Sequence, residues 1–211
     1  MDFTSRMTSL LSELRRERNG EVADTMRFYG RGCGLNLGVS IPTIRSVAGG
    51  FECGHAFAEY LYRQDVRELR IAALWLADAD AVGPQSFDFW AAGIVNSEIA
   101  EQAAMALFAK CGCIDELLRR WGASDDALLA YTALLASSRN GECDAALLLG
   151  TAIETICRFR DNILIGRGVV AAVVSVQPRA GEAVRRFADT VGRDGCATAR
   201  YVAEELSWML E

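Results

Sequence analysis

Residues 125–158 read DDALLAYTALLASSRNGECDAALLLGTAIETICR, and this stretch carries the pattern that decides the fold. Apolar residues recur at steps of three and four on both sides of the Asn140-Gly141 break. That spacing is the period of an α-helix and differs from the alternation of a β-strand. The stretch therefore predicts two helices, over 125–138 and 143–158, separated by a short turn.

The same helical period extends through most of the chain, and no segment shows a convincing strand alternation. Residues 3–18 predict an amphipathic helix, whereas residues 30–40 contain four glycines and predict a loop. Ser40 then caps a helix that carries Pro42 in its first turn. Further helices are predicted over 21–29, 54–63, 65–78, 85–94, 97–111, 113–121, 161–176, 179–192 and 196–210.

Helix pairs that recur about every 30 to 40 residues are typical of solenoid proteins. The chain is therefore predicted to be all-α, a single domain over residues 1–211 built as a right-handed α-solenoid of HEAT-like repeats. Because the repeats share little sequence, a compact irregular helical bundle is the competing architecture.

The 211-residue chain is 51% hydrophobic and carries a formal charge of −6, which argues against a broad electrostatic grip on nucleic acid. The acidity is concentrated in the middle, because residues 71–150 hold four basic and eleven acidic side chains. Residues 1–70 hold ten and nine, and residues 151–211 hold eight and eight. The composition therefore leaves room for a narrow DNA-facing surface at the two ends.

Seven cysteines with scattered spacing predict free thiols in a cytoplasmic protein. The first residues lack the pattern of a signal peptide, and the apolar run over 163–176 is shorter than a membrane span. We interpret that run as a buried core helix and expect no membrane contact. Cys111 and Cys113 form one close pair without a second pair or a nearby histidine, so neither a metal nor another cofactor is expected. A metal- or thiol-dependent enzyme that uses this pair is the weaker alternative.

Three groups of residues are candidates for binding or chemistry, and each has a competing structural explanation. The first group is Arg45, Arg67 and Arg70; the second runs from Asn96 to Gln102 and includes Ser97, Glu98 and Glu101; the third is Arg158, Phe159, Arg160 and Arg167. Ion pairs with Glu68 are the structural explanation for the first group, and a capped helix with a solvated acidic turn is that for the second. For Arg167 the structural explanation is an exposed arginine on a half-buried helix, and the tryptophans have the helical spacing of core residues.

Several segments together resemble the DNA alkylation repair family, the AlkD-type alkylpurine DNA glycosylases built from HEAT-like repeats. The most specific pieces are Gly38-Val-x-x-Pro-x-x-Arg45 and Arg67-Glu-x-Arg70. The segments that carry the resemblance are 26–29 (MRFY), 37–45 (LGVSIPTIR), 61–74 (LYRQDVRELRIAAL), 96–108 and 159–166.

The resemblance implies a curved solenoid that holds double-stranded DNA on its concave face and removes N3- or N7-alkylated purines without a cofactor. It implies that Glu101 is the catalytic carboxylate. The family's two active-site tryptophans, which would contact a cationic base through their rings, fall on Ser97 and Arg167. The residues that it places at the DNA are Tyr29, Arg45, Arg67, Arg70, Ser97, Glu98, Arg158, Phe159, Arg160 and Arg167.

Two functions follow as hypotheses. The first is a DNA-binding repair protein, with or without glycosylase activity in an altered pocket. The second is a non-catalytic HEAT-like scaffold that binds a protein partner or an unusual DNA structure, which the missing tryptophans and the acidic middle both favour. In either case a monomer is expected.

Overall fold

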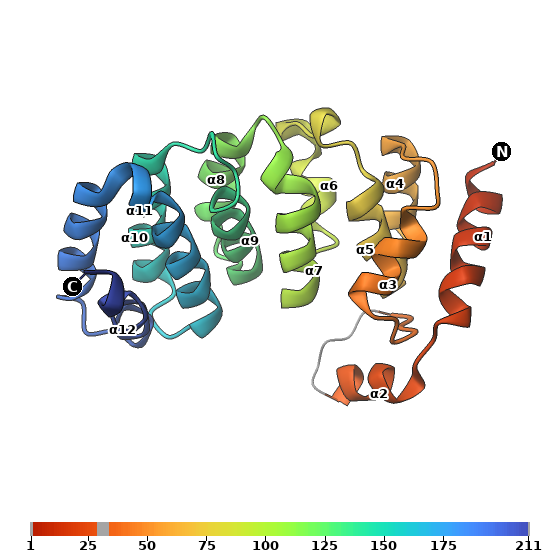
Figure 1. Cartoon of the computed structure of the whole chain (residues 1–211), viewed down its shortest axis with the longest axis horizontal. Helices are drawn as coiled ribbons and strands as arrows, with labels where there is room; N and C mark the ends of the chain where they lie inside the picture. The colour runs from red at the N-terminus through yellow and green to blue at the C-terminus, as the bar shows by residue number, and fades with distance from the viewer. Residues whose placement is uncertain (1, 29–33, 211) are drawn as a thin grey trace. The chain divides into compact units, whose positions relative to one another are not determined.

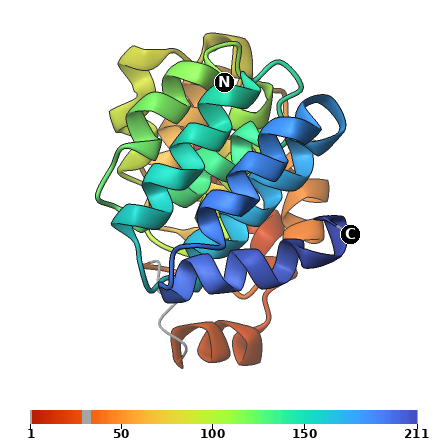
Figure 2. The same cartoon turned by 90° about the vertical axis from the view of Figure 1, so that its left-hand side faces the viewer.

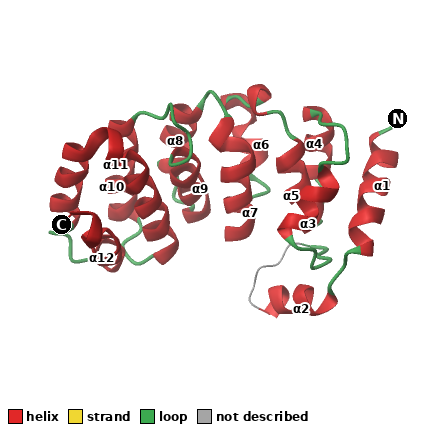
Figure 3. Ribbon diagram, in the orientation of Figure 1, coloured by secondary structure: helices red, strands yellow, loops and turns green. Residues whose placement is uncertain are grey.

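The computed structural model describes residues 2–28 and 34–210 as helices joined by loops, and these residues form no β-strand (Figures 1 and 3). One isolated parallel bridge joins Leu35 to Val66. The prediction of an all-α fold is therefore confirmed.

The chain divides into two compact units, Met1–Leu107 and Phe108–Glu211, whereas a single domain over 1–211 stays a prediction. The first unit contains α1 (Phe3–Arg16), α2 (Gly20–Phe28), α3 (Ile41–Ala48), α4 (His55–Tyr62), α5 (Arg67–Leu76), η1 (Ala79–Ala81), η2 (Pro84–Ser86), α6 (Phe87–Ala91), α7 (Ser97–Gln102) and η3 (Ala103–Leu107). The second unit contains η4 (Phe108–Lys110), α8 (Ile114–Gly122), α9 (Ala127–Ser137), α10 (Ala145–Arg158), α11 (Ile163–Val191) and α12 (Ala197–Leu210).

Helix α5 is the central helix of the first unit. It packs against α3, α4, α7 and η3, and residues from Ile71 to Leu74 are fully buried. In Figure 1 helices α3, α5 and α7 lie in a row. We call the partly exposed side of this row, with Arg45 of α3, Trp75 of α5 and Gln102 of α7, the α3–α5–α7 face.

Helix α9 is the central helix of the second unit, because it is apolar on nearly all sides and buried from Ala130 to Ser137. It packs against α8 and α11, and α11 in turn packs against α10 and α12. Figure 2 shows α12 lying crosswise against its neighbours. The predicted Asn140-Gly141 break separates α9 from α10, so the two helices predicted at 125–138 and 143–158 are confirmed.

Helix α11 is long and apolar enough, by length and composition, to cross a membrane, and it is the one such helix among the described residues. Its residues from Ile165 to Val176 contribute seven buried positions, and it contacts three other helices of its unit. Pro178 and the non-helical Ala180 (φ −142°, ψ 36°) bend it. These contacts bury one side of the helix, and 39% of its most apolar 18-residue window is buried, so the prediction of a buried core helix over 163–176 holds for that side alone.

The predicted helix over 97–111 changes its winding twice. After α7 the chain forms the π-helical turn η3 and then the 3-10 turn η4. Short π-helical segments inside helices occur frequently at functional sites. Here the π-helical turn directly follows Gln102, on the α3–α5–α7 face.

Candidate functional site

Helix α7 begins where the sequence predicts a cap, and this start fixes the positions of its acidic residues. The Ile99 N–H donates to Asn96 Oδ1 at 2.9 Å, so Asn96 is the N-cap residue. Ser97, Glu98 and Glu101 are all half-buried in the first turns. Ser97 and Glu101 are four residues apart and therefore lie on the same side of the helix.

Glu98 is held by Arg67 of α5 through a two-point ion pair. Arg67 Nε and Nη2 donate to the two carboxylate oxygens of Glu98, each at 2.7 Å. Arg67 Nη1 donates to Glu68 Oε1 and to the Val39 carbonyl oxygen, each at 2.8 Å. Four of the five guanidinium N–H groups are thus used inside the protein, and Arg67 is 2% exposed. Arg67 forms the ion pair with Glu68 that was the competing explanation, whereas its contact with DNA stays a prediction.

Backbone N–H groups complete the environment of Glu68, which is fully buried. The Leu37 N–H donates to the carboxylate at 3.1 Å and the Val39 N–H at 3.3 Å. Gly38, between them, has φ +72° and is the one positive-φ residue that the structure describes. This conformation turns the flanking N–H groups toward a single anion.

We call this group the Arg67 cluster: the side chains of Arg67, Glu68 and Glu98 with the backbone of Leu37–Val39. Burial alone would lower the pKa of Arg67, but the hydrogen bonds and charges of Glu98 and Glu68 outweigh it and raise the pKa above its ordinary value. The two motif pieces that carry the family resemblance therefore meet in one buried ionic cluster.

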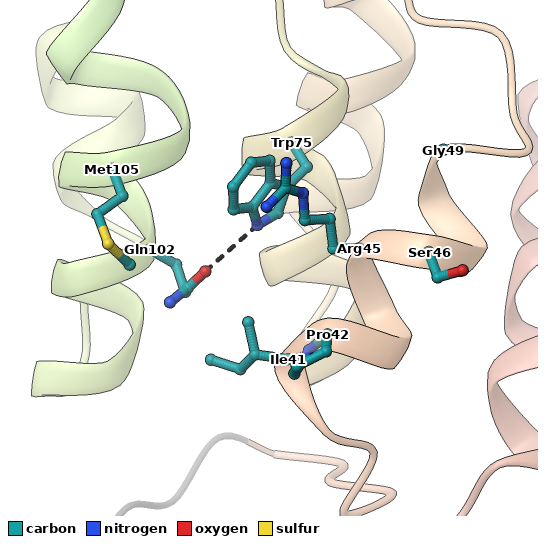
Figure 4. Close-up of a pocket in the computed structure, with 8 residues that line it drawn as sticks. All are labelled: Ile41, Pro42, Arg45, Ser46, Gly49, Trp75, Gln102 and Met105. Atoms are coloured by element: carbon teal, nitrogen blue, oxygen red, sulfur yellow. Dashed lines mark hydrogen bonds between the residues drawn. The ribbon is translucent and has the colours of Figure 1, made fainter.

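A pocket of about 720 Å³ lies on the α3–α5–α7 face (Figure 4). Trp75 of α5 donates from Nε1 to Gln102 Oε1 at 3.3 Å. The guanidinium carbon of Arg45 lies 4.4 Å from the centroid of the Trp75 ring, in a cation–π contact. Ile41, Pro42 and Met105 add apolar walls.

This pocket was not predicted from the sequence. Trp75 is half-buried and carries an arginine, although its spacing predicts a core residue. The prediction is confirmed for Trp90 and Trp121, which are buried, and is wrong for Trp208, which is 68% exposed. The sequence contains one indication that Gln102 belongs to the site: it follows Glu98 by four residues, so the two side chains face the same neighbouring helix.

Arg70 and Arg158 are engaged by their own surroundings. Arg70 Nη2 lies 3.1 Å from Asp65 Oδ1. Arg158 Nη1 donates to the Gly122 and Ser124 carbonyl oxygens at 2.7 and 3.3 Å, which ties α10 to the turn after α8. Both guanidinium groups thus have partners in their own unit, although Arg70 Nε is buried without a hydrogen-bond partner among the described residues, and neither side chain enters the proposal below.

Arg160 and Phe159 lie at the junction between α10 and α11. Arg160 makes a two-point ion pair with Asp194, at 3.0 and 3.3 Å. The Cys196 backbone N–H, followed by further hydrogen bonds and the charge of Arg160, lowers the pKa of Asp194 below its ordinary value. The Phe159 carbonyl oxygen accepts from the Thr198 hydroxyl at 2.6 Å. The Arg160–Asp194 ion pair and the Thr198–Phe159 hydrogen bond join the segment before α11 to the segment at the start of α12.

Arg167 is exposed on α11 and forms no ion pair within the described part of the chain. The glycines on either side of it face neighbouring helices: Gly166 lies against Tyr201 of α12 and Gly168 against Tyr131 of α9, so both glycines allow close helix packing. Tyr29, the remaining predicted DNA contact, lies outside the described residues.

The Cys111–Cys113 pair lacks the properties of a reactive site. Burial, together with the neighbouring Cys113, raises the pKa of the Cys111 thiol to about 12. That thiol therefore stays protonated at neutral pH and is a poor nucleophile. Within residues 2–28 and 34–210, no group of three or more His, Cys, Asp or Glu side chains could hold a metal ion.

Comparisons with known proteins support the resemblance. No match is found among curated proteins. One solved structure is described as "a new family of proteins related to the HEAT-like repeat DNA glycosylases with affinity for branched DNA structures". It matches with a TM-score of 0.71 and 16% sequence identity over 99% of this chain and 95% of that one, which shows the HEAT-like fold. The sequence profile of the family described as DNA alkylation repair enzyme matches residues 10–157, so the chain belongs to the DNA alkylation repair family.

Proposed function

We propose that this protein binds DNA that carries a branch or an unpaired segment, and that it does not excise alkylated bases. Family membership supports DNA as the ligand. The solved structure that shares the fold belongs to proteins with affinity for branched DNA structures, which supports the choice of DNA form.

The observation that carries the proposal is the nature of the two side chains at the family's tryptophan positions. Ser97 is a half-buried hydroxyl and Arg167 an exposed guanidinium, so neither offers an aromatic face to a cationic base. The positive charge of Arg167 repels such a base, whereas it suits a phosphate group. Glu98 is already held in an ion pair with Arg67, and Glu101 is the carboxylate to which the resemblance assigns the catalytic role.

Arg45 and Arg167 are the predicted DNA contacts that the structure leaves available. Both are exposed, and neither forms an ion pair with another described residue. We propose that each contacts a phosphate group, Arg45 from the first unit and Arg167 from the second. With two such contacts and a charge of −6, the DNA-contacting surface is expected to be narrow and binding weak, with a slope of about −2 for log affinity against log salt concentration.

The first test compares a labelled four-way junction, a fork and a fully paired duplex by fluorescence anisotropy at several salt concentrations. We expect the junction and the fork to bind more tightly than the duplex. The double variant Arg45→Ala/Arg167→Ala should lower the slope of log affinity against log salt by about 1 to 2, because each phosphate contact contributes roughly 1. Arg186→Ala is the matched control, since Arg186 is exposed but paired with Glu182. Absence of binding to every DNA at low salt would contradict the proposal and favour a protein partner.

The second test concerns excision. We expect no release of 7-methylguanine or 3-methyladenine from alkylated DNA above a no-protein control, at protein concentrations that saturate the DNA. The physical reason is that Ser97 and Arg167 occupy the family's two tryptophan positions, and neither has an aromatic ring to contact a cationic base. Release that disappears in Glu101→Gln would overturn this part of the proposal and assign the catalytic role to Glu101.

A further inference from the structure

The pocket on the α3–α5–α7 face has the size and chemistry of a small-ligand site. Its volume of about 720 Å³ lies within the roughly 300–1,000 Å³ that is typical of such sites. Apolar side chains form most of its walls, and Gln102 and Arg45 supply polar groups. This combination suits a flat ligand with apolar faces and a polar edge.

Gln102 is the feature that points most directly to a ligand. Its side chain is 4% exposed, and its Oε1 accepts from Trp75 Nε1. Because an indole N–H only donates, the amide oxygen must face Trp75, and the amide NH₂ must point elsewhere. Figure 4 shows that nitrogen turned away from the indole, beside the open space of the pocket. Gln102 lines the pocket, so its amide NH₂ group can donate to a ligand there.

Arg45 and Trp75 form a stacking platform beside this donor. The guanidinium lies 4.4 Å from the indole centroid, and Arg45 is exposed. Nucleobases stack on aromatic rings and on arginine planes, and this stacking tolerates any base sequence. The pocket therefore offers both a surface for the face of a base and a donor for its edge.

We infer that this pocket receives a neutral, unpaired nucleobase of the bound DNA. The face of the base stacks on the Arg45 guanidinium, which itself lies over the Trp75 ring, while the N–H groups at the edge of that guanidinium donate to a phosphate group. An acceptor on the edge of the base takes a hydrogen bond from the Gln102 amide. A cationic alkylated base is disfavoured, because Arg45 is the one charged residue that lines the pocket in the described structure. The inference rests on the proposed function and adds the reason why DNA with unpaired bases is preferred.

The test uses forks that carry 2-aminopurine, a fluorescent neutral base, at an unpaired position, and matched duplexes with the same base paired. We expect the full chain to change the 2-aminopurine emission in the fork and to bind the fork more tightly. Gln102→Glu keeps the acceptor for Trp75 and nearly the same shape, but it removes the amide donors. It should reduce the ratio of fork to duplex affinity about 2- to 12-fold, the range for losing one hydrogen bond. The added negative charge weakens the binding of fork and duplex alike, so this effect cancels in the ratio of the two affinities.

A second variant and a control complete the test. Trp75→Leu should also reduce the ratio, whereas Phe89→Leu should not. Phe89 is a half-buried aromatic residue that carries Arg63 at 4.9 Å, so it is matched in kind but lies outside the pocket. Circular dichroism shows whether each variant is folded. An unchanged ratio in folded Gln102→Glu and Trp75→Leu would overturn the inference while the proposed DNA binding stands.

A short single-stranded oligonucleotide with 2-aminopurine separates the two possible failures. Binding of this probe that Gln102→Glu abolishes would support the pocket even if no fork or duplex binds, in which case only the proposed function fails. No binding of the probe to the wild-type chain, together with an unchanged fork-to-duplex ratio, would exclude a base in the pocket.

Discussion

Replacing Arg67 by methionine is expected to lower the free energy of unfolding by about 3 to 5 kcal/mol, the usual cost of removing one partner from a buried ion pair. Methionine fills similar space but leaves the carboxylates of Glu68 and Glu98 without their cation. Glu68 is 0% exposed and cannot turn to solvent, although two backbone N–H groups still bind it. Urea denaturation followed by circular dichroism measures the loss.

The matched control is Arg27→Met. Arg27 pairs with Asp24 at 2.9 Å, but both side chains are more than 70% exposed, so a change of about 0.5 kcal/mol or less is expected. A triple variant that also carries Glu68→Gln and Glu98→Gln should be more stable than Arg67→Met alone, because no buried charge then lacks a partner. An equal loss of unfolding free energy in Arg67→Met and Arg27→Met would show that burial of the Arg67 cluster contributes nothing to stability.

The helices of this chain could be predicted from its sequence because each depends on neighbours in the same segment. The apolar period and the Asn140-Gly141 break locate α9 and α10. The sequence predicts a capped helix in the segment from Asn96 to Gln102, and Asn96 caps α7. The change to π-helical winding after Gln102 left no such local signal, since residues 97–111 have an ordinary helical pattern.

The site depended on contacts between segments, which spacing along the chain does not reveal. Arg67 and Glu98 are 31 residues apart, and an arginine beside a glutamate usually indicates a solvated surface. Burial of Arg67 becomes predictable only once α5 is known to pack against α7 and the Leu37–Val39 segment. Trp75 shows the same limit, because an aromatic residue at helical spacing fits a core and a pocket wall equally well.

The second large effect is expected for Gly38→Ala, which should lower the free energy of unfolding by about 2 kcal/mol or more. The left-handed conformation at φ +72° costs a residue with a Cβ atom roughly 1 to 2 kcal/mol. A Cβ atom would also overlap the Asn19 carbonyl oxygen, which accepts the Ala23 N–H at 3.0 Å near the start of α2. Relief of this overlap must move either α2 or the backbone that binds Glu68. Gly112→Ala is the control, because nothing lies within 4 Å of its added Cβ atom and its φ is not positive.

A double-mutant cycle then tests whether Gly38 acts through the Arg67 cluster. In Arg67→Met the Glu68 carboxylate depends on the Leu37 and Val39 N–H groups, and Gly38→Ala displaces these donors. The combined loss should therefore exceed the sum of the single losses by more than about 0.5 kcal/mol, the limit within which independent sites add. Additive losses would mean that Gly38 contributes through its contact with α2 alone. A positive coupling would instead show that the two motif pieces of the family stabilise one structure, the anion site around Glu68.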